Sequence, residues 1–143
     1  MDDQYFMKKA LEEARRALEM DEVPIGAVVV SNDRIIARGH NITEHLNDVT
    51  AHAEMQAITA AANYLNGKYL NDCTLYVTVE PCTTCAGALG WSQIGRIVYG
   101  ASDPKRGYMS YAPLALHPRT QVTAGVLADE AASLMKEFFK KKR

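Results

Sequence analysis

Residues 74–85 read Thr-Leu-Tyr-Val-Thr-Val-Glu-Pro-Cys-Thr-Thr-Cys, and this stretch indicates the fold most clearly. The run 74–78 is typical of a β-strand, because β-branched and aromatic residues dominate it. Pro81 suits the first turn of a helix, which we expect to extend to about Trp91. A strand that leads at once into a helix is the unit from which layered α/β domains are built.

Helices and strands alternate on both sides of this unit. The apolar residues of the first helix recur at three- and four-residue spacing, which predicts one buried face. Thr50 is expected to cap the second helix and Gly67 to end it. The pattern predicts a single domain over residues 1–143, with helices covering a central sheet that begins with an antiparallel hairpin. The expected helices cover residues 5–18, 51–65, 81–91 and 128–142, and the expected strands residues 25–30, 34–38, 74–78, 96–99 and 120–124.

Composition narrows the class of protein. The chain has 143 residues, of which 48% are hydrophobic and 23% charged, as in ordinary globular domains. Three cysteines are too few for a disulfide framework and fit a reducing compartment. No apolar run approaches the ~20 residues of a membrane span, and the acidic N-terminus does not resemble a signal peptide. We therefore expect a cytoplasmic protein that does not enter a membrane.

Two short segments carry side chains that bind metals, Thr50-Ala-His-Ala-Glu54 and Pro81-Cys-Thr-Thr-Cys85. Cys82 and Cys85 are three residues apart, so they share one helical face and can reach one ion. Their place in the first helical turn stabilises the thiolate, the form that binds zinc. Together with His52 they make three ligands, which leave a tetrahedral zinc one open position for water. We expect one zinc ion per chain, in a catalytic site.

Glu54 supplies what a hydrolytic site needs besides the metal. It follows His52 by two residues, so it lies near the open position without being needed as a ligand. A carboxylate there can accept a proton from water, protonate a ring nitrogen and later protonate a departing amine. Hydrolytic removal of an exocyclic amino group from a heteroaromatic base requires those transfers. Glu54 is therefore the expected catalytic residue.

Other interpretations of the cysteine pair explain less of the sequence. A thioredoxin-type redox pair leaves the His-x-Glu segment without a role. A structural zinc would need a fourth ligand, and none of the other histidines (His40, His45 and His117) has a partner at ligand spacing; we expect them to be surface or supporting residues. Cys73 is expected to be a small buried hydrophobe. His-x-Glu followed about thirty residues later by Pro-Cys-x-x-Cys is the signature of zinc-dependent nucleobase deaminases.

The chain resembles the cytidine-deaminase superfamily and, within it, the bacterial tRNA-specific adenosine deaminases. The resemblance extends over nearly the whole length. It rests on residues 22–28, 37–41, 50–54, 73–78, 80–82, 85–87, 95–101 and 138–139.

This resemblance implies a three-layer α/β/α cytidine-deaminase-like fold, with a mixed five-stranded sheet covered by helices. It also implies a homodimer that converts the wobble adenosine of a tRNA anticodon to inosine. By position, Asn41 matches the family asparagine that reads the flipped base, and Ile25 and Ala53 match residues that pack around it. An asparagine can donate to and accept from a purine edge. The same residue is also common in turns, and Asn41 could simply close the hairpin's exit.

Two segments depart from the family pattern. Thr83 and Thr84 stand where the family has bulkier apolar residues. Residues 106–113 replace a Gly- and Ser-containing segment that faces the substrate entrance in the family, and the loop up to Arg119 is shorter. The substrate therefore stays open between tRNA and a free base or nucleoside such as guanine, cytosine or cytidine. A catalytically silent zinc- or RNA-binding module is a further alternative, although it would have no need of Glu54.

If the substrate is tRNA, the anticodon arm needs contacts outside the metal site. Arg106, Tyr108 and Tyr111 would supply a charge and stacking surfaces for unpaired nucleotides. Lys140 and Lys141 begin the basic run 140–143 and would contact phosphates, although such a run also suits a solvated helix end. Phe138 and Phe139 fall on the apolar side of the last helix and are expected in the core.

A second copy of the chain would need a surface that allows helices to approach closely. Small residues follow Cys85 at Ala86, Gly87, Ala88 and Gly90. With the family resemblance, they predict a two-fold symmetric homodimer.

Overall fold

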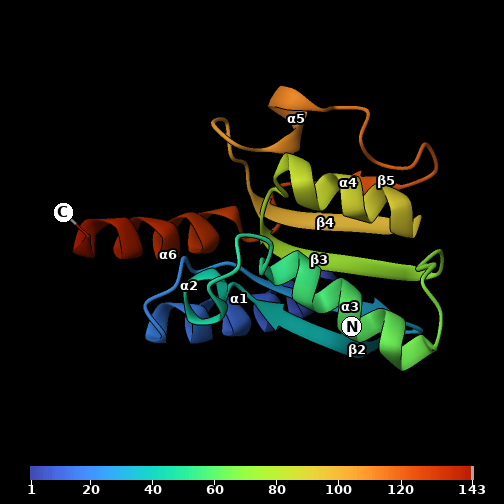
Figure 1. Cartoon of the computed structure of the whole chain (residues 1–143), viewed down its shortest axis with the longest axis horizontal. Helices are drawn as coiled ribbons and strands as arrows, with labels where there is room; N and C mark the ends of the chain where they lie inside the picture. The colour runs from blue at the N-terminus through green and yellow to red at the C-terminus, as the bar shows by residue number, and fades with distance from the viewer. Residues whose placement is uncertain (143) are drawn as a thin grey trace.

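Five strands form one mixed sheet in the order β2-β1-β3-β4-β5 in the computed structural model, which describes residues 1–142 (Figure 1). β1 pairs antiparallel with both β2 and β3, whereas β3, β4 and β5 run parallel. The mixed five-stranded sheet confirms the expected fold class. The strands are β1 (Gly26–Ser31), β2 (Arg34–His40), β3 (Cys73–Val79), β4 (Arg96–Ala101) and β5 (Gln121–Thr123).

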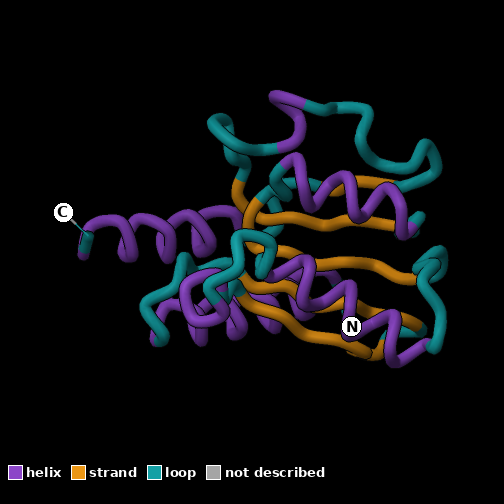
Figure 2. Tube along the Cα trace, viewed as in Figure 1, coloured by secondary structure: helices purple, strands orange, loops and turns teal. Residues whose placement is uncertain are grey.

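Helices cover both faces of the sheet and make three layers, as Figure 2 shows. On one face lie α3 (Ala53–Leu65) and α4 (Thr83–Ser92); on the other lie α1 (Asp3–Glu19) and α6 (Ala128–Lys141). A hydrophobic core lies on each face of the sheet, and alternate residues of β1 belong to each core. Ala27 and Val29 pack under α3, and Val28 and Val30 pack under α1. Because the central strands are buried on both faces, their sequences are mostly apolar rather than alternating.

The hairpin between β1 and β2 turns at Asn32 and Asp33. Both residues have positive φ angles, 51° and 63°, which gives the turn the twist that two-residue hairpins favour. The predicted hairpin is therefore confirmed.

Strand direction determines where the loops meet. β2 is antiparallel to β1, and β1 is antiparallel to β3, so β2, β3 and β4 all point the same way. Their carboxyl ends lie together at one end of the strands, and sites in α/β folds are usually located there. The loops that leave this end lead into α3, into α4 and into the segment after β4.

Several predicted helix ends were wrong by a few residues. Thr50 does not cap α3: its amide and hydroxyl both donate to Asp48 Oδ1, and His52 is the N-cap. Pro81 precedes the N-cap of α4 rather than entering the helix. Asn66, in the left-handed conformation, ends α3 instead of Gly67. Two four-residue helices, α2 (Thr43–Leu46) and α5 (Tyr108–Tyr111), were not predicted because they are too short to show periodicity.

Two further observations concern burial and length. Cys73 is buried on β3 and makes part of the core under α3, as expected. Within residues 1–142, every helix is too short or too polar to cross a membrane.

Candidate active site

The first turns of α3 and α4 lie side by side at the edge where β2 and β3 end (Figure 1). His52 is the N-cap of α3 and Cys82 is the N-cap of α4, and neither side chain caps its own helix. Both side chains are therefore free to face the other helix. Gly39 allows α3 to sit this close to β2, because a Cβ there would lie 2.5 Å from the Ala53 carbonyl oxygen.

Three ligand atoms converge between the two helices. Nδ1 of His52 lies 3.4 Å from Sγ of Cys85 and 3.6 Å from Sγ of Cys82. Donor atoms on a tetrahedral zinc, at about 2.1 to 2.3 Å from the metal, are separated by about 3.6 Å. The three side chains therefore fit one zinc ion. In the described part of the chain they are the one group of three His, Cys, Asp or Glu residues close enough to share an ion.

The electrostatics favour a cation. A hydrogen bond with Cys85 lowers the pKa of the Cys82 thiol to about 4, although burial opposes the shift. The same hydrogen bond, together with burial, raises the pKa of Cys85. The hydrogen bond with Cys82 also raises the pKa of His52. The pair thus includes one thiolate at neutral pH, the form of cysteine that binds zinc.

Glu54 lies in the first turn of α3 and is 4% exposed. Burial raises the pKa of its carboxyl to about 7, and the negative charge of Cys82 adds to the shift. The adjacent Cys85 thiol acts in the opposite direction and lowers the pKa of Glu54. A group with this pKa can both accept and release a proton near neutral pH.

The structure places all three predicted substrate residues around the start of α3. Asn41 follows β2 directly and is mostly buried. Its Nδ2 donates to the carbonyl of Val23 at 3.3 Å, and its Oδ1 accepts from the amide of Thr43 at 3.3 Å. Ile25 packs against the core that contains Ala53. The bonds of Asn41 are also those of a turn residue, so its role in reading a base stays a prediction.

Buried carboxylates outside the metal site were missed by sequence reasoning. Glu22 has no exposed surface and accepts from Nδ1 of His45, and Glu13 accepts from Nδ1 of His40 at 3.1 Å. These contacts make both histidines supporting residues, as expected. The sequence signals were weak: Glu22 precedes an apolar strand, and Glu13 falls among the apolar residues of α1.

The segment after β4 differs from expectation at one position. Tyr108 is only 2% exposed, because its amide donates to the carbonyl of Pro81 and its ring joins the core beside Tyr99. The prediction that Tyr108 offers a stacking surface was therefore wrong. Tyr111 is 65% exposed and Arg106 is exposed, so both remain available for a substrate.

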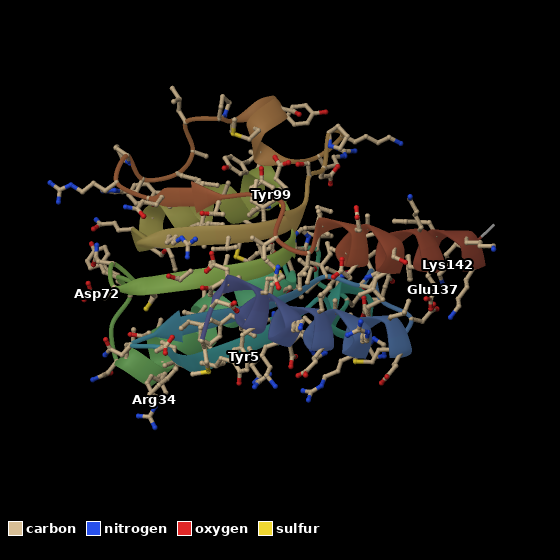
Figure 3. All side chains as sticks on the ribbon, turned by 180° about the vertical axis from the view of Figure 1, so that it is seen from behind. Tyr5, Arg34, Asp72, Tyr99, Glu137 and Lys142 are labelled. Carbon is tan, nitrogen blue, oxygen red and sulfur yellow. The ribbon has the colours of Figure 1, made fainter. Side chains whose placement is uncertain are left out.

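The basic C-terminal run is partly engaged within the chain. Nζ of Lys142 lies 2.7 Å from Asp21 and above the ring of Phe138, and Lys141 pairs with Glu137. Figure 3 shows Glu137 and Lys142 toward the free end of α6. Lys140 is exposed, and Arg143 lies outside the described residues. Phe138 is buried as expected, whereas Phe139 is half exposed, contrary to expectation.

The small residues of α4 do not all face outward. Ala86 is fully buried in this chain's own core. A Cβ at Gly90 would lie 2.2 Å from the carbonyl of Ala115, so Gly90 admits a loop of the same chain rather than a second copy. Gly87 has open space above it.

Comparison with known proteins gives concordant matches over the full length. The MafB19-like deaminase family matches residues 1–143. A tRNA-specific adenosine deaminase of Agrobacterium fabrum is 46% identical over 144 residues, covering 97% of this chain and 95% of the relative.

Solved structures of two kinds share the fold. One, from a study of A-to-I editing by tRNA:A34 deaminases at the wobble position of transfer RNA, has a TM-score of 0.85 and 46% identity, covering 91% of this chain and 98% of that one. A guanine deaminase from Nitrosomonas europaea has a TM-score of 0.81 and 27% identity, covering 94% of this chain and 83% of that one.

Proposed function

The chain belongs to the MafB19-like deaminases and to the family of the tRNA-specific adenosine deaminases, and we propose on that basis that it converts the wobble adenosine of a tRNA anticodon to inosine. It is a hydrolytic deaminase that acts on a C–N bond. The observation that carries the proposal is the His52, Cys82 and Cys85 cluster beside the buried carboxyl of Glu54, within a chain matched from end to end by tRNA deaminases. In the reaction, water replaces the exocyclic amine and ammonia leaves.

We propose zinc as the cofactor, one ion per chain, held by Nδ1 of His52 and the sulfurs of Cys82 and Cys85. The distances among these atoms and the thiolate character of Cys82 support this choice. When bound, zinc supplies Lewis acidity that makes water a nucleophile at neutral pH. With three protein ligands, the site keeps room for that water.

Glu54 is proposed to carry the protons. Its carboxylate takes a proton from the attacking water and delivers it to a ring nitrogen of the base. It then transfers the remaining proton of that water to the amino group, which leaves as ammonia. A pKa of about 7 suits both halves of this cycle, because the carboxyl gives up a proton about as readily as it takes one.

Three residues near the start of the site are proposed to bind the base. Asn41 reads the purine edge, and Ile25 and Ala53 pack around it. Further along the polynucleotide, Arg106 and Tyr111 are exposed after β4 and are proposed to meet neighbouring nucleotides. Lys140 and Lys141 are proposed to contact phosphates of the anticodon arm.

We also propose that the chain forms a homodimer. Trp91, at the end of α4, is 86% exposed, and the surface above Gly87 is open. An exposed aromatic next to open helix surface is typical of an interface.

The decisive experiment compares substrates side by side. Purified protein is incubated with an anticodon stem-loop carrying adenosine at the wobble position, with the same stem-loop carrying that adenosine one nucleotide away, and with free adenosine, guanine and cytosine. Mass spectrometry identifies any product, because deamination exchanges a net NH for O and so changes the mass of the base. Conversion of the wobble adenosine alone is the expected result. Turnover of free guanine with none on RNA would overturn the substrate and favour the chemistry of the guanine deaminase that shares this fold.

A further inference from the structure

Glu80 is a buried carboxylate that lies beside the metal site but takes no part in it. It stands immediately after β3 and two residues before Cys82, and it is 7% exposed. Burying a carboxylate is costly unless hydrogen bonds compensate it. Its bonding partners therefore indicate its purpose.

Both oxygens of Glu80 accept backbone amides from the segment after β4. Oε1 accepts from the amide of Asp103 at 3.0 Å, and Oε2 accepts from the amide of Met109 at 3.1 Å. Met109 is the second residue of α5, so the carboxylate satisfies one of the amides that every helix start leaves unpaired. One side chain thus holds the two ends of residues 103–109, which we call the entrance loop.

Gly107 shows how closely the entrance loop wraps this carboxylate. A Cβ at Gly107 would lie 2.2 Å from Oε2 of Glu80 and 2.5 Å from the carbonyl oxygen of Asp103. Any side chain at Gly107 would therefore move the loop or the carboxylate.

The entrance loop is also joined to the metal-site segment. Gly107 forms an isolated antiparallel bridge with Cys82, and the amide of Tyr108 donates to the carbonyl of Pro81 at 2.9 Å. The position of Arg106 relative to Cys82 therefore depends on the same few contacts that centre on Glu80.

From this arrangement we infer that Glu80 is a positioning residue for substrate recognition: its carboxylate holds the entrance loop, and with it Arg106 and Tyr111, at a fixed distance from the metal site. The recognition part of this inference rests on the proposed function. The holding part does not, because it concerns only the chain's own contacts. An amide side chain could replace only one of the two accepting oxygens, and its NH₂ would face a backbone N–H.

The first test needs no catalytic activity. Lys105 and Arg106 are exposed trypsin sites inside the entrance loop. In Glu80→Gln, cleavage after these residues, followed by mass spectrometry, should be about tenfold faster than in the wild type, as the loss of one charge-assisted hydrogen bond implies. Zinc content per chain should not change. Glu12→Gln, an exposed carboxylate on α1, is the matched control and should be cleaved at the wild-type rate.

The second test separates recognition from chemistry. For the wobble stem-loop, Glu80→Gln should raise KM several-fold while kcat stays within about twofold, since the metal ligands and Glu54 are untouched. Gly107→Ala displaces the same contact without removing a charge. It should reproduce both the faster cleavage and the higher KM, so it tests the inference even if Glu80→Gln folds poorly. Wild-type cleavage rates in both variants, or loss of zinc in both, would overturn the inference. If the wild type deaminates no RNA, the proposed function fails while the cleavage test still decides the holding role.

Discussion

Nδ1 of His45 lies 2.7 Å from Oε2 of Glu22, a carboxylate with no exposed surface. The same carboxylate accepts the backbone amides of His45 at 2.8 Å and Glu44 at 3.1 Å. Glu22 lies between α1 and β1, so these bonds attach α2 to the end of α1. Because α2 follows Asn41 almost directly, the carboxylate also limits how far the proposed base-reading residue can move.

Replacing Glu22 with Gln should destabilise the protein at neutral pH by about 1.5–3 kcal/mol, the usual loss for a hydrogen bond to a charged group. Burial by itself would raise the pKa of Glu22, but hydrogen bonds from the ring and amide of His45 and the amide of Glu44 lower it below 4.5 overall. A lowered folded-state pKa means that the stabilisation is complete above about pH 4.5 and is lost as pH falls through the folded-state pKa.

Urea unfolding of wild type and Glu22→Gln between pH 3 and pH 7 measures this difference. The gap in unfolding free energy should be largest at pH 7 and should narrow toward pH 3. Glu44→Gln changes an exposed neighbour and serves as the control. A gap of equal size at both ends of the range would show that the charge of Glu22 is not responsible.

Removal of one proposed ligand should release the metal. Cys85→Ala takes away a sulfur that lies 3.4 Å from Nδ1 of His52, and two remaining ligands hold zinc weakly. Metal analysis after gel filtration should show that most of the zinc has dissociated. Cys73→Ala removes a buried thiol outside the site and should keep about one zinc per chain. Full zinc content in Cys85→Ala would refute the ligand assignment.

Glu54→Gln should keep the metal and the fold but lower turnover by about 10²–10⁴-fold, the usual contribution of a general acid–base group. The amide has nearly the same size and cannot carry the proton from water to the base. The measurements are zinc content, thermal unfolding and single-turnover deamination of the wobble stem-loop. Turnover within a few-fold of wild type would mean that another residue moves the proton.

The sequence predicted the sheet and the cluster of ligands for identifiable physical reasons. In amphipathic helices and in strands, the spacing of apolar residues can be recognised from positions only a few residues apart in the sequence. One metal site could be assigned to His52, Cys82 and Cys85 because the segments that carry them follow strands whose carboxyl ends lie together. The types of these three residues then restrict the choice of metal.

What could not be predicted depends on contacts between distant segments. Glu80 is buried because it accepts an amide 29 residues away, and Glu22 because it accepts one 23 residues away. No local pattern reports such pairing. Tyr108 looked like an exposed ring for the same reason: only its contacts with Pro81 and with the core under α4 show that this one side chain of α5 is buried.

The proposed homodimer should depend on the exposed end of α4. Trp91→Lys places a charge where an aromatic side chain would be buried between two copies, and charges are depleted at interface cores. Sedimentation at micromolar concentration should show a dimer for wild type and a shift toward monomer for the variant. Tyr5→Lys, on the opposite face of the sheet, should remain dimeric. A wild-type protein that is monomeric at micromolar concentration would exclude the homodimer.

The C-terminal run offers the sharpest separation of an RNA substrate from a free base. Lys142 is already paired with Asp21, so we expect Lys140 and Lys141, on the exposed side of α6, to meet phosphates. In the double variant Lys140→Gln/Lys141→Gln, affinity for the wobble stem-loop should fall most at low salt. The slope of log affinity against log salt should become shallower by roughly one for each phosphate that the variant no longer neutralises. Zinc content and thermal stability should stay near wild type, because among residues 1–142 the salt bridge removed is the exposed pair of Lys141 with Glu137. Lys68→Gln on the α3–β3 connection is a matched control, and its salt slope should not change.

Against a free base the double variant should behave like wild type, since no phosphate is engaged. Unchanged affinity and an unchanged salt slope on RNA would remove Lys140 and Lys141 from the binding surface and leave the entrance loop as the main recognition element.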